Sequence, residues 1–279
     1  MESLLREVAE VVVLPRHRRL IDGQVEEKAP GEVVTVADRE AESLLSAGLS
    51  RILPGVPVVG EEAASSDPAL LRLLSTDARL WLVDPIDGTS NFVAGSDDFA
   101  MMIALVDSGK TVAAWIHHPV SGTTYRAECG AGASRNDERL VISETAKPLS
   151  QLCGIALTRF LSASQRSAVE GVSARMSHVA HGVAAAGIEY PRVTTGSLDF
   201  ALFWRTLPWD HAPGALLVTE AGGVVAHLDG QEYRPGRSQE GLLIAGSQRC
   251  WTDVQQAFDL TAQVVMGNRR TVVAGSGKA

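Results

Sequence analysis

The chain has 279 residues, 45% of them hydrophobic, and a formal net charge of −8 at pH 7. This composition is ordinary for a soluble protein with a sizeable core, and no run approaches the roughly 18 apolar residues of a membrane span. The negative charge disfavours general binding to nucleic-acid polymers or membrane surfaces. Cys129, Cys153 and Cys250 show no close spacing, so they indicate neither a disulfide framework nor a zinc site and favour a cytoplasmic location.

Two helices followed by a mostly antiparallel sheet are predicted for the first half of the chain. Apolar residues at helical spacing predict an opening helix that ends or kinks at Pro15, and the polar residues 24–31 are expected to form a mobile loop. A second helix is expected to begin at or near Asp38. Taken alone, an acid at this place could simply favour the helix dipole.

Residues 80–92, which read LWLVDPIDGTSNF, are the most informative stretch of the chain. The apolar residues predict a buried strand leading into Asp84 and Asp87, and Pro85 is expected to stop its ladder because it has no N–H to donate. Gly88 permits a tight turn. Carboxylates suit divalent cations and N–H groups at a helix start suit phosphates, so this stretch predicts a site for Mg²⁺ and a phosphate ester.

Gly60, Glu61 and Glu62 repeat this order of short strand, glycine and acids. Either glutamate alone would usually be a solvated loop acid. Two strands that each end in carboxylates within 30 residues make a shared site more plausible. A competing interpretation is a phosphatase that forms an aspartyl-phosphate on a D-x-D-G-T strand end. Here two residues, not one, separate Asp84 from Asp87, which changes the face of the second acid and disfavours that chemistry.

Alternating strands and helices are predicted for the second half of the chain. We place the boundary at Lys147-Pro148, between a first half of residues 1–146 and a second half of residues 147–279. A helix is expected over residues 209–221. Asp210 could be its ordinary N-cap, but the N–H that it would bind is missing.

That N–H is missing because position 213 is a proline, which is tolerated in a first helical turn. The Asp210 carboxylate therefore has fewer local partners than a normal cap. We expect it to be free to bind a metal ion together with Asp87.

Three motifs occur in an order and spacing that resemble the inositol monophosphatase family, within the Mg²⁺-dependent, lithium-sensitive phosphatase superfamily. They are Gly60-Glu61-Glu62, Trp81 through Phe92, and Pro208 through Gly223. The resemblance implies a mixed α+β and α/β fold, a layered α-β-α-β-α sandwich, that usually forms a homodimer. It also implies a phosphomonoesterase with two or three Mg²⁺ ions per subunit, in which a metal-activated water attacks phosphorus.

The resemblance implies a role for each matching residue. The metal ligands would be Glu61, Asp84, the Ile86 carbonyl, Asp87 and Asp210, with Asp84 shared between two ions and Glu61 also serving a third, weaker one. Asp38 and Thr89 would position and deprotonate the attacking water, with Glu61 also counted among the catalytic residues. The N–H groups of Gly88 and Thr89 would hold the phosphate. Glu62 would contact the metal ligands without binding the metal itself.

The residues expected to contact the alcohol part of the substrate depart from the family pattern. Inositol-binding members place a glutamate seven residues before the last metal aspartate, and Phe203 stands there in this chain. A phenylalanine cannot accept a hydroxyl's hydrogen bond, and an unpaired buried group costs about 1–3 kcal/mol. Phe203 could equally be a core residue. The family's Gly-Ser/Thr-Ala-Ala pocket motif reads Ala184-Ala185-Ala186-Gly187, without the hydroxyl.

We therefore expect a pocket formed by Ala185, Ala186 and Phe203 that takes a small soluble ester resembling an inositol, sugar or histidinol phosphate. One alternative is a 3′(2′),5′-bisphosphate nucleotidase, which would need a base-stacking aromatic residue and a basic groove. Another is a catalytically idle metal-binding homologue. The intact acids and Thr89 argue against an idle site.

Overall fold

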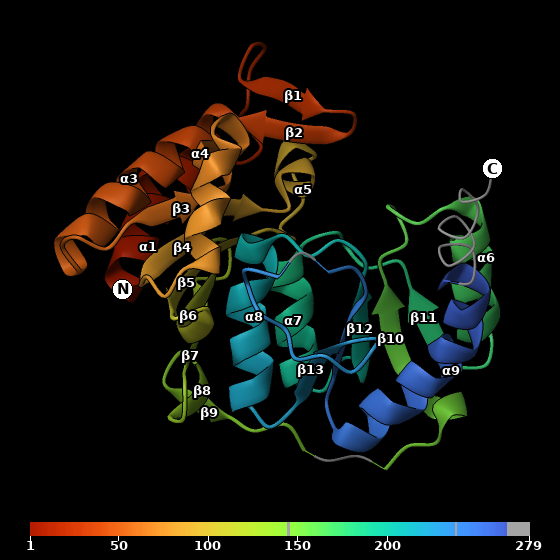
Figure 1. The fold of residues 1–279 in the computed structure, drawn as a ribbon. Helices are drawn as coiled ribbons and strands as arrows, with labels where there is room; N and C mark the ends of the chain where they lie inside the picture. The colour runs from red at the N-terminus through yellow and green to blue at the C-terminus, as the bar shows by residue number, and fades with distance from the viewer. Residues whose placement is uncertain (144–145, 238, 267–279) are drawn as a thin grey trace, which may run out of the picture.

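Helices and sheets alternate through the molecule in five layers, as Figure 1 shows from the red helices to the blue helix. The computed structural model describes residues 1–143, 146–237 and 239–266. This order confirms the layered sandwich expected from the sequence. None of the described helices has the length and apolar character needed to cross a bilayer.

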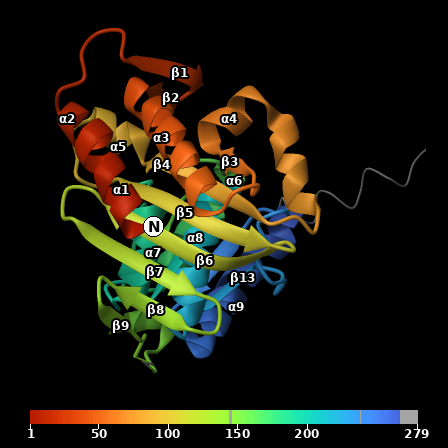
Figure 2. The same ribbon diagram turned by 90° about the vertical axis from the view of Figure 1, so that its left-hand side faces the viewer.

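The first helical layer covers one face of a seven-stranded sheet (Figure 2). It contains α1 (Glu2–Val8), a π-helical turn (Ala9–Val13), α2 (Leu14–Arg16) and α3 (Val36–Ile52). A two-stranded hairpin of β1 (Val25–Ala29) and β2 (Glu32–Thr35) precedes α3. The loop predicted over residues 24–31 was therefore wrong for most of its length. The strand was missed because polar side chains cover a hairpin that is exposed to solvent.

The seven-stranded sheet has the order β3-β4-β5-β6-β7-β8-β9. Its strands are β3 (Val58–Gly60), β4 (Leu80–Asp87), β5 (Ala100–Asp107), β6 (Lys110–His118), β7 (Thr123–Glu128), β8 (Gly132–Arg135) and β9 (Glu138–Leu140). Strands β3 and β4 pair parallel and the other neighbours pair antiparallel. The short helices α4 (Glu61–Ser66) and α5 (Thr89–Val93) begin where β3 and β4 end, and a 3₁₀ segment (Pro68–Ser75) follows α4.

Pro85 does not end β4, which corrects the prediction made from its missing N–H. The strand continues to Asp87, which pairs with Ala100, and the register shifts between Asp84 and Asp87. An irregularity of this kind tolerates a residue that donates no ladder hydrogen bond. It also re-aims the side chains that follow, so both acids lie at the same end of the sheet.

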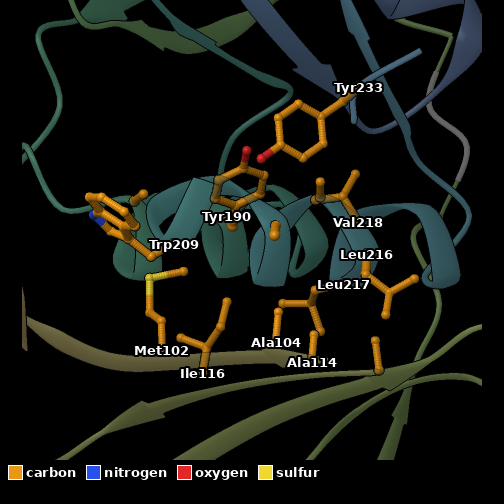
Figure 3. Close-up of a cluster of buried hydrophobic side chains, with 14 of the residues drawn as sticks. Met102, Ala104, Ala114, Ile116, Tyr190, Trp209, Leu216, Leu217, Val218 and Tyr233 are labelled. Atoms are coloured by element: carbon orange, nitrogen blue, oxygen red, sulfur yellow. The ribbon is translucent and has the colours of Figure 1, made fainter. Parts of the chain in front are cut away.

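The middle layer consists of α7 (Ala186–Thr194) and α8 (Pro208–Glu220), between the two sheets. Figure 3 shows side chains of α8 above Met102, Ala104, Ala114 and Ile116 of the large sheet. Alternate residues of β4 point to opposite faces of the large sheet. Leu80 and Leu82 pack against this middle layer, and Trp81 and Val83 pack against α1 and α3. This period of two is what a strand buried on both sides requires.

The second sheet has the order β11-β10-β12-β14-β13 and mixes parallel and antiparallel pairs. Its strands are β10 (Cys153–Ala156), β11 (His178–Ala180), β12 (Phe200–Phe203), β13 (Val224–His227) and β14 (Leu242–Ala245). A 3₁₀ turn (Leu149–Gln151) precedes β10. The outer layer is formed by α6 (Ala163–Ser173) and α9 (Gln248–Met266).

Candidate active site

Four acids from three elements, α4, β4 and α8, lie within electrostatic range of one another near the ends of β3 and β4. Gly60 of β3 lies beside Val83 of β4, so Glu61, which follows β3, lies next to the last residues of β4, which include Asp84 and Asp87. Helix α8 packs against β4 and supplies Asp210. Burial and the negative charges of Glu61, Asp87 and Asp210 raise the pKa of Asp84 well above its usual range. The expected cluster of metal-binding acids is therefore assembled at one place.

Asp84 is the strongest indication of a cation site. Its side chain is buried, and its Oδ1 atom has no hydrogen-bond partner in the described structure. Burying a carboxylate oxygen without a partner is costly, and neighbouring carboxylates increase the cost. Mg²⁺ prefers carboxylate and carbonyl oxygens, so these residues fit that ion.

The side chains of these acids do not point at one common position in the described part of the structure. Among the described residues, no group of three or more Asp, Glu, His or Cys side chains has the geometry of one. Both Glu61 and Asp87 are engaged by other parts of the chain.

Glu61 is held by Lys28, a residue that lies outside all the motifs predicted to form the site. The Lys28 Nζ donates hydrogen bonds to Glu61 Oε1 at 2.8 Å and to Glu62 Oε1 at 2.6 Å. Burial alone would lower the pKa of Lys28, but the charges and hydrogen bonds of Glu61 and Glu62 raise it. Lys28 thus supplies positive charge to the site from the β1–β2 hairpin.

Glu42 is a second residue that was missed, and it fixes the start of α4. Its two carboxylate oxygens accept hydrogen bonds from the N–H groups of Glu62 and Ala63, at 2.8 and 2.9 Å. A Cβ at Gly60 would lie 2.2 Å from the Glu42 carboxyl carbon, so only glycine permits this approach. The signal in the sequence is the spacing of Asp38 and Glu42, four residues apart on the buried face of α3.

Asp87 is held by the start of α7. Its Oδ1 accepts from the Ala186 N–H at 3.2 Å, and its Oδ2 accepts from the Gly187 N–H at 2.6 Å. Burial raises the pKa of Asp87 to about 7 although these N–H groups oppose the shift. Ala185 is fully buried, and a Cβ at Gly88, where φ is +84°, would lie 2.8 Å from the Ala185 Cβ. The small-residue motif thus packs directly against the strand that carries the acids.

Asp38 and Thr89 are also brought together. The Thr89 Oγ1 lies 3.1 Å from Asp38 Oδ1 and 2.9 Å from the Ile86 carbonyl oxygen. Asp38 Oδ2 accepts from the Thr35 N–H at 2.8 Å and from its hydroxyl at 2.6 Å, within a capping box at the start of α3. Burial raises the pKa of Asp38 to about 7. Asp38 therefore caps its helix and also contacts the expected catalytic hydroxyl.

Asp210 is the third residue of α8, and the N-cap position is Leu207. The N-cap interpretation of Asp210 was therefore wrong, because the helix starts earlier, with Pro208 in its first turn. Burial and the charge of Asp87 raise the pKa of Asp210, while the charge of Arg205 opposes the shift. Asp210 thus lies within range of Asp87, as a shared cation site requires.

Phe203 is the last residue of β12 and is 3% exposed. Its ring stacks on Tyr190, with centroids 5.3 Å apart. The Tyr190 hydroxyl lies 2.9 Å from His211 Nδ1, and His211 Nε2 lies 3.0 Å from the Arg205 carbonyl oxygen. This packing fits the core interpretation of Phe203, and a substrate-pocket role for Ala185, Ala186 and Phe203 stays a prediction.

Asp38 and Asp87 are expected to stabilise the protein without metal less at pH 8 than at pH 5.5. Asp38 and Asp87 have pKa values of about 7 in the folded state against an ordinary 3.8, so the folded state binds more protons between these values. Their contribution to stability must then fall as pH rises from about 4 to about 7, by about 2 kcal/mol for each group between pH 5.5 and 8. The buried His117 and His211, whose pKa values are lowered to about 4 and about 3, act in the opposite direction below pH 6.5, so urea unfolding in a chelator compares the wild type with Asp38→Asn at the two pH values. The variant should lose about 2 kcal/mol less than the wild type between pH 5.5 and 8, and an equal loss would contradict the burial of this charge.

The model of the inositol monophosphatase family matches residues 2–263. The chain belongs to the inositol monophosphatase family. It is a phosphoric monoester hydrolase that acts on small phosphate esters, and Mg²⁺ dependence is the general property of this family.

Individual relatives agree with this assignment. An inositol-1-monophosphatase of Mesorhizobium japonicum is 33% identical over 81% of this chain and 82% of its own length. A fructose-1,6-bisphosphatase/inositol-1-monophosphatase of Thermotoga maritima is 32% identical over 82% of this chain and 84% of its own length. The solved structure of a Thermotoga maritima inositol monophosphatase superposes with a TM-score of 0.79 at 28% identity, covering 95% of this chain and 97% of that one.

Proposed function

We propose that this family member hydrolyses its phosphate ester at a Mg²⁺ site centred on Asp84. The observation that supports the proposal is the buried Asp84 Oδ1 atom, which lacks a hydrogen-bond partner among nearby carboxylates. The ligands would be Glu61, Asp84, the Ile86 carbonyl, Asp87 and Asp210, for two or three ions per subunit. When bound, Mg²⁺ supplies charge that offsets that of the phosphate and makes a coordinated water more acidic.

The chain's own residues would orient the reactants and move the proton. Thr89 Oγ1 lies next to both Asp38 and the Ile86 carbonyl, so it can accept a hydrogen bond from the attacking water while donating to Asp38. Asp38 would receive the proton, and its raised pKa suits that role near neutral pH. The N–H groups of Gly88 and Thr89 would hold the phosphate oxygens, and Glu62 would keep Lys28 beside the ligands.

The substrate is proposed to be a small sugar- or histidinol-phosphate-like ester rather than inositol-1-phosphate. Phe203 stands in place of the family's inositol-binding glutamate and is buried against Tyr190, so it offers no acceptor to a ring hydroxyl. The bisphosphate nucleotidase alternative is kept because one observation favours it. The Phe160 ring is 45% exposed and lies beside the guanidinium groups of Arg159 and Arg205, as a base-stacking, basic surface would require.

A panel of esters tests the proposed function. Phosphate release with Mg²⁺ is measured from inositol-1-phosphate, histidinol phosphate, fructose-1,6-bisphosphate and adenosine 3′,5′-bisphosphate. At least one of the last three is expected to exceed inositol-1-phosphate in kcat/KM by about 10-fold or more, as one unpaired hydroxyl predicts. A preference for inositol-1-phosphate would contradict the substrate proposal, and no release from any ester would favour the idle homologue.

Three further properties are proposed from the family resemblance. We expect lithium to inhibit phosphate release in the same assay, because it competes with Mg²⁺ at the weaker position. A homodimer is expected in sedimentation, and a cytoplasmic location agrees with the three cysteines, none of which forms a disulfide within the described residues.

A further inference from the structure

The β1–β2 hairpin connects the acid cluster to the second half of the chain. Figure 1 shows the hairpin projecting above α5. Lys28 on β1 binds Glu61 and Glu62. At the turn and the start of β2, the Gly31 carbonyl accepts from Arg159 Nη2 at 2.5 Å, and Glu32 pairs with Arg205. The hairpin therefore touches the metal-binding acids at one point and two arginines at another.

Gly31 allows the close approach to Arg159. Its φ is +75°, and a Cβ there would lie 2.3 Å from Arg159 Nη2. The turn of the hairpin is thus shaped to lie against this arginine.

Arg205 lies close enough to the acid cluster for its positive charge to oppose the rise in the pKa of Asp210. It lies in the loop between β12 and α8, five residues before Asp210. The hydrogen bond between its carbonyl and His211 ties this loop to the first turn of α8. Its guanidinium carbon lies 4.2 Å from the centroid of the Phe160 ring, a stacking contact that orients the guanidinium group.

The partner of Arg205 is easily replaced. The ion pair with Glu32 is partly exposed, with side-chain exposures of 38% and 32%. Such pairs contribute little to stability, so another anion could take the place of Glu32 at small cost. A guanidinium matches carboxylate and phosphate groups, and a protein with a net charge of −8 needs local positive charge to bind a substrate with two anionic groups.

We propose that Arg205 binds a second anionic group, a phosphate or a carboxylate, on the alcohol part of the substrate, and that Glu32 occupies this position until the substrate displaces it. The proposal rests on the proposed function, since it names the substrate class of the same site. Phe160 is then a positioning residue, which holds the guanidinium plane. Among the proposed substrates this favours sugar and nucleotide bisphosphates, whose leaving alcohol carries its own negative charge, over histidinol phosphate, whose alcohol is cationic.

Two substitutions with opposite expected effects test this proposal. Arg205→Gln should lower kcat/KM for fructose-1,6-bisphosphate and adenosine 3′,5′-bisphosphate by about 10- to 100-fold, the effect of one lost charged hydrogen bond. Glycerol-2-phosphate, whose alcohol is neutral, should change less than about 2-fold, within the scatter of near-neutral surface changes. Glu32→Gln should raise kcat/KM for the two bisphosphates, because it removes the competing carboxylate.

The matched control is Glu26→Gln, which removes another hairpin ion pair, with Arg39, on the exposed side. It should leave the ratio of bisphosphate to glycerol-2-phosphate turnover unchanged. If the Arg205–Glu32 pair only fastens the hairpin, both variants should lower turnover of every ester together, and that result would overturn the proposal. Measuring kcat/KM for 3-phosphoglycerate as well shows whether Arg205 binds a carboxylate on the alcohol part as it binds a second phosphate.

A failure of the proposed function can be distinguished from a failure of the Arg205 proposal. If the wild-type protein hydrolyses none of these esters, that function is contradicted, and calorimetric binding of fructose-1,6-bisphosphate decides the present proposal. Arg205→Gln must then raise its Kd by about 10-fold or more, and Glu32→Gln must lower it. Unchanged Kd values in both variants would overturn it.

Discussion

Asp84→Asn is expected to lower phosphate release by at least about 10³-fold while the fold is kept. A shared metal ligand supports charge stabilisation worth several kcal/mol, and each 1.4 kcal/mol is about tenfold in rate. The change removes one charge but hardly alters the size of a side chain that is buried in β4. Initial rates at saturating Mg²⁺, with circular dichroism to check the fold, measure the effect.

A second readout separates metal binding from structural damage in this variant. Without metal, the ionised Asp84 carboxylate is opposed by burial and by neighbouring acids. Its neutral replacement should therefore unfold at an equal or higher temperature in a chelator, and should gain less from added Mg²⁺ than the wild type. Asp107→Asn, which changes a partly exposed acid paired with Arg79, is the control and should behave like the wild type. Wild-type activity in Asp84→Asn would refute the metal assignment.

Asp38→Asn is expected to lower kcat by about 10²- to 10⁴-fold with little change in KM, the range usual for loss of a positioned base. The amide can still accept from the Thr35 N–H, so the capping of α3 is largely preserved. It cannot take up a proton through Thr89, whose Oγ1 lies 3.1 Å from Asp38 Oδ1.

Substitutions at Thr89 provide the matched comparison. Thr89→Ser keeps the hydroxyl and should retain most of the activity, whereas Thr89→Val should resemble Asp38→Asn. If Asp38→Asn lowers stability but leaves kcat unchanged, Asp38 is only a helix cap. Steady-state kinetics and urea unfolding of the three variants distinguish these outcomes.

The residues that could be predicted from the sequence lie in continuous motifs. Asp84, Asp87 and Gly88 lie at the end of one strand, and this order of apolar residues, acids and glycine predicts a cation and phosphate site before the fold is known. The alternating elements of the second half likewise predict its α/β character. The order of neighbouring residues is sufficient to predict these features, because the strand or helix that contains each side chain determines where it lies.

The residues that were missed act across long separations in the chain. Lys28 reaches Glu61 and Glu62 from a polar hairpin, and Glu42 caps α4 from another helix. Nothing in the residues next to Lys28 indicates that it enters the acid cluster. The continuation of β4 past Pro85 was missed for a different reason, since a shift in register depends on the partner strand.

The most direct test of the central claim is phosphate release from fructose-1,6-bisphosphate and histidinol phosphate as a function of Mg²⁺ concentration. Wild-type and Asp84→Asn protein are compared after treatment with a chelator. A Mg²⁺-dependent phosphatase centred on Asp84 predicts a saturable rate for the wild type that vanishes in chelator and returns with Mg²⁺, and almost no rate for the variant. Release that persists in chelator, or that Asp84→Asn retains, would contradict it.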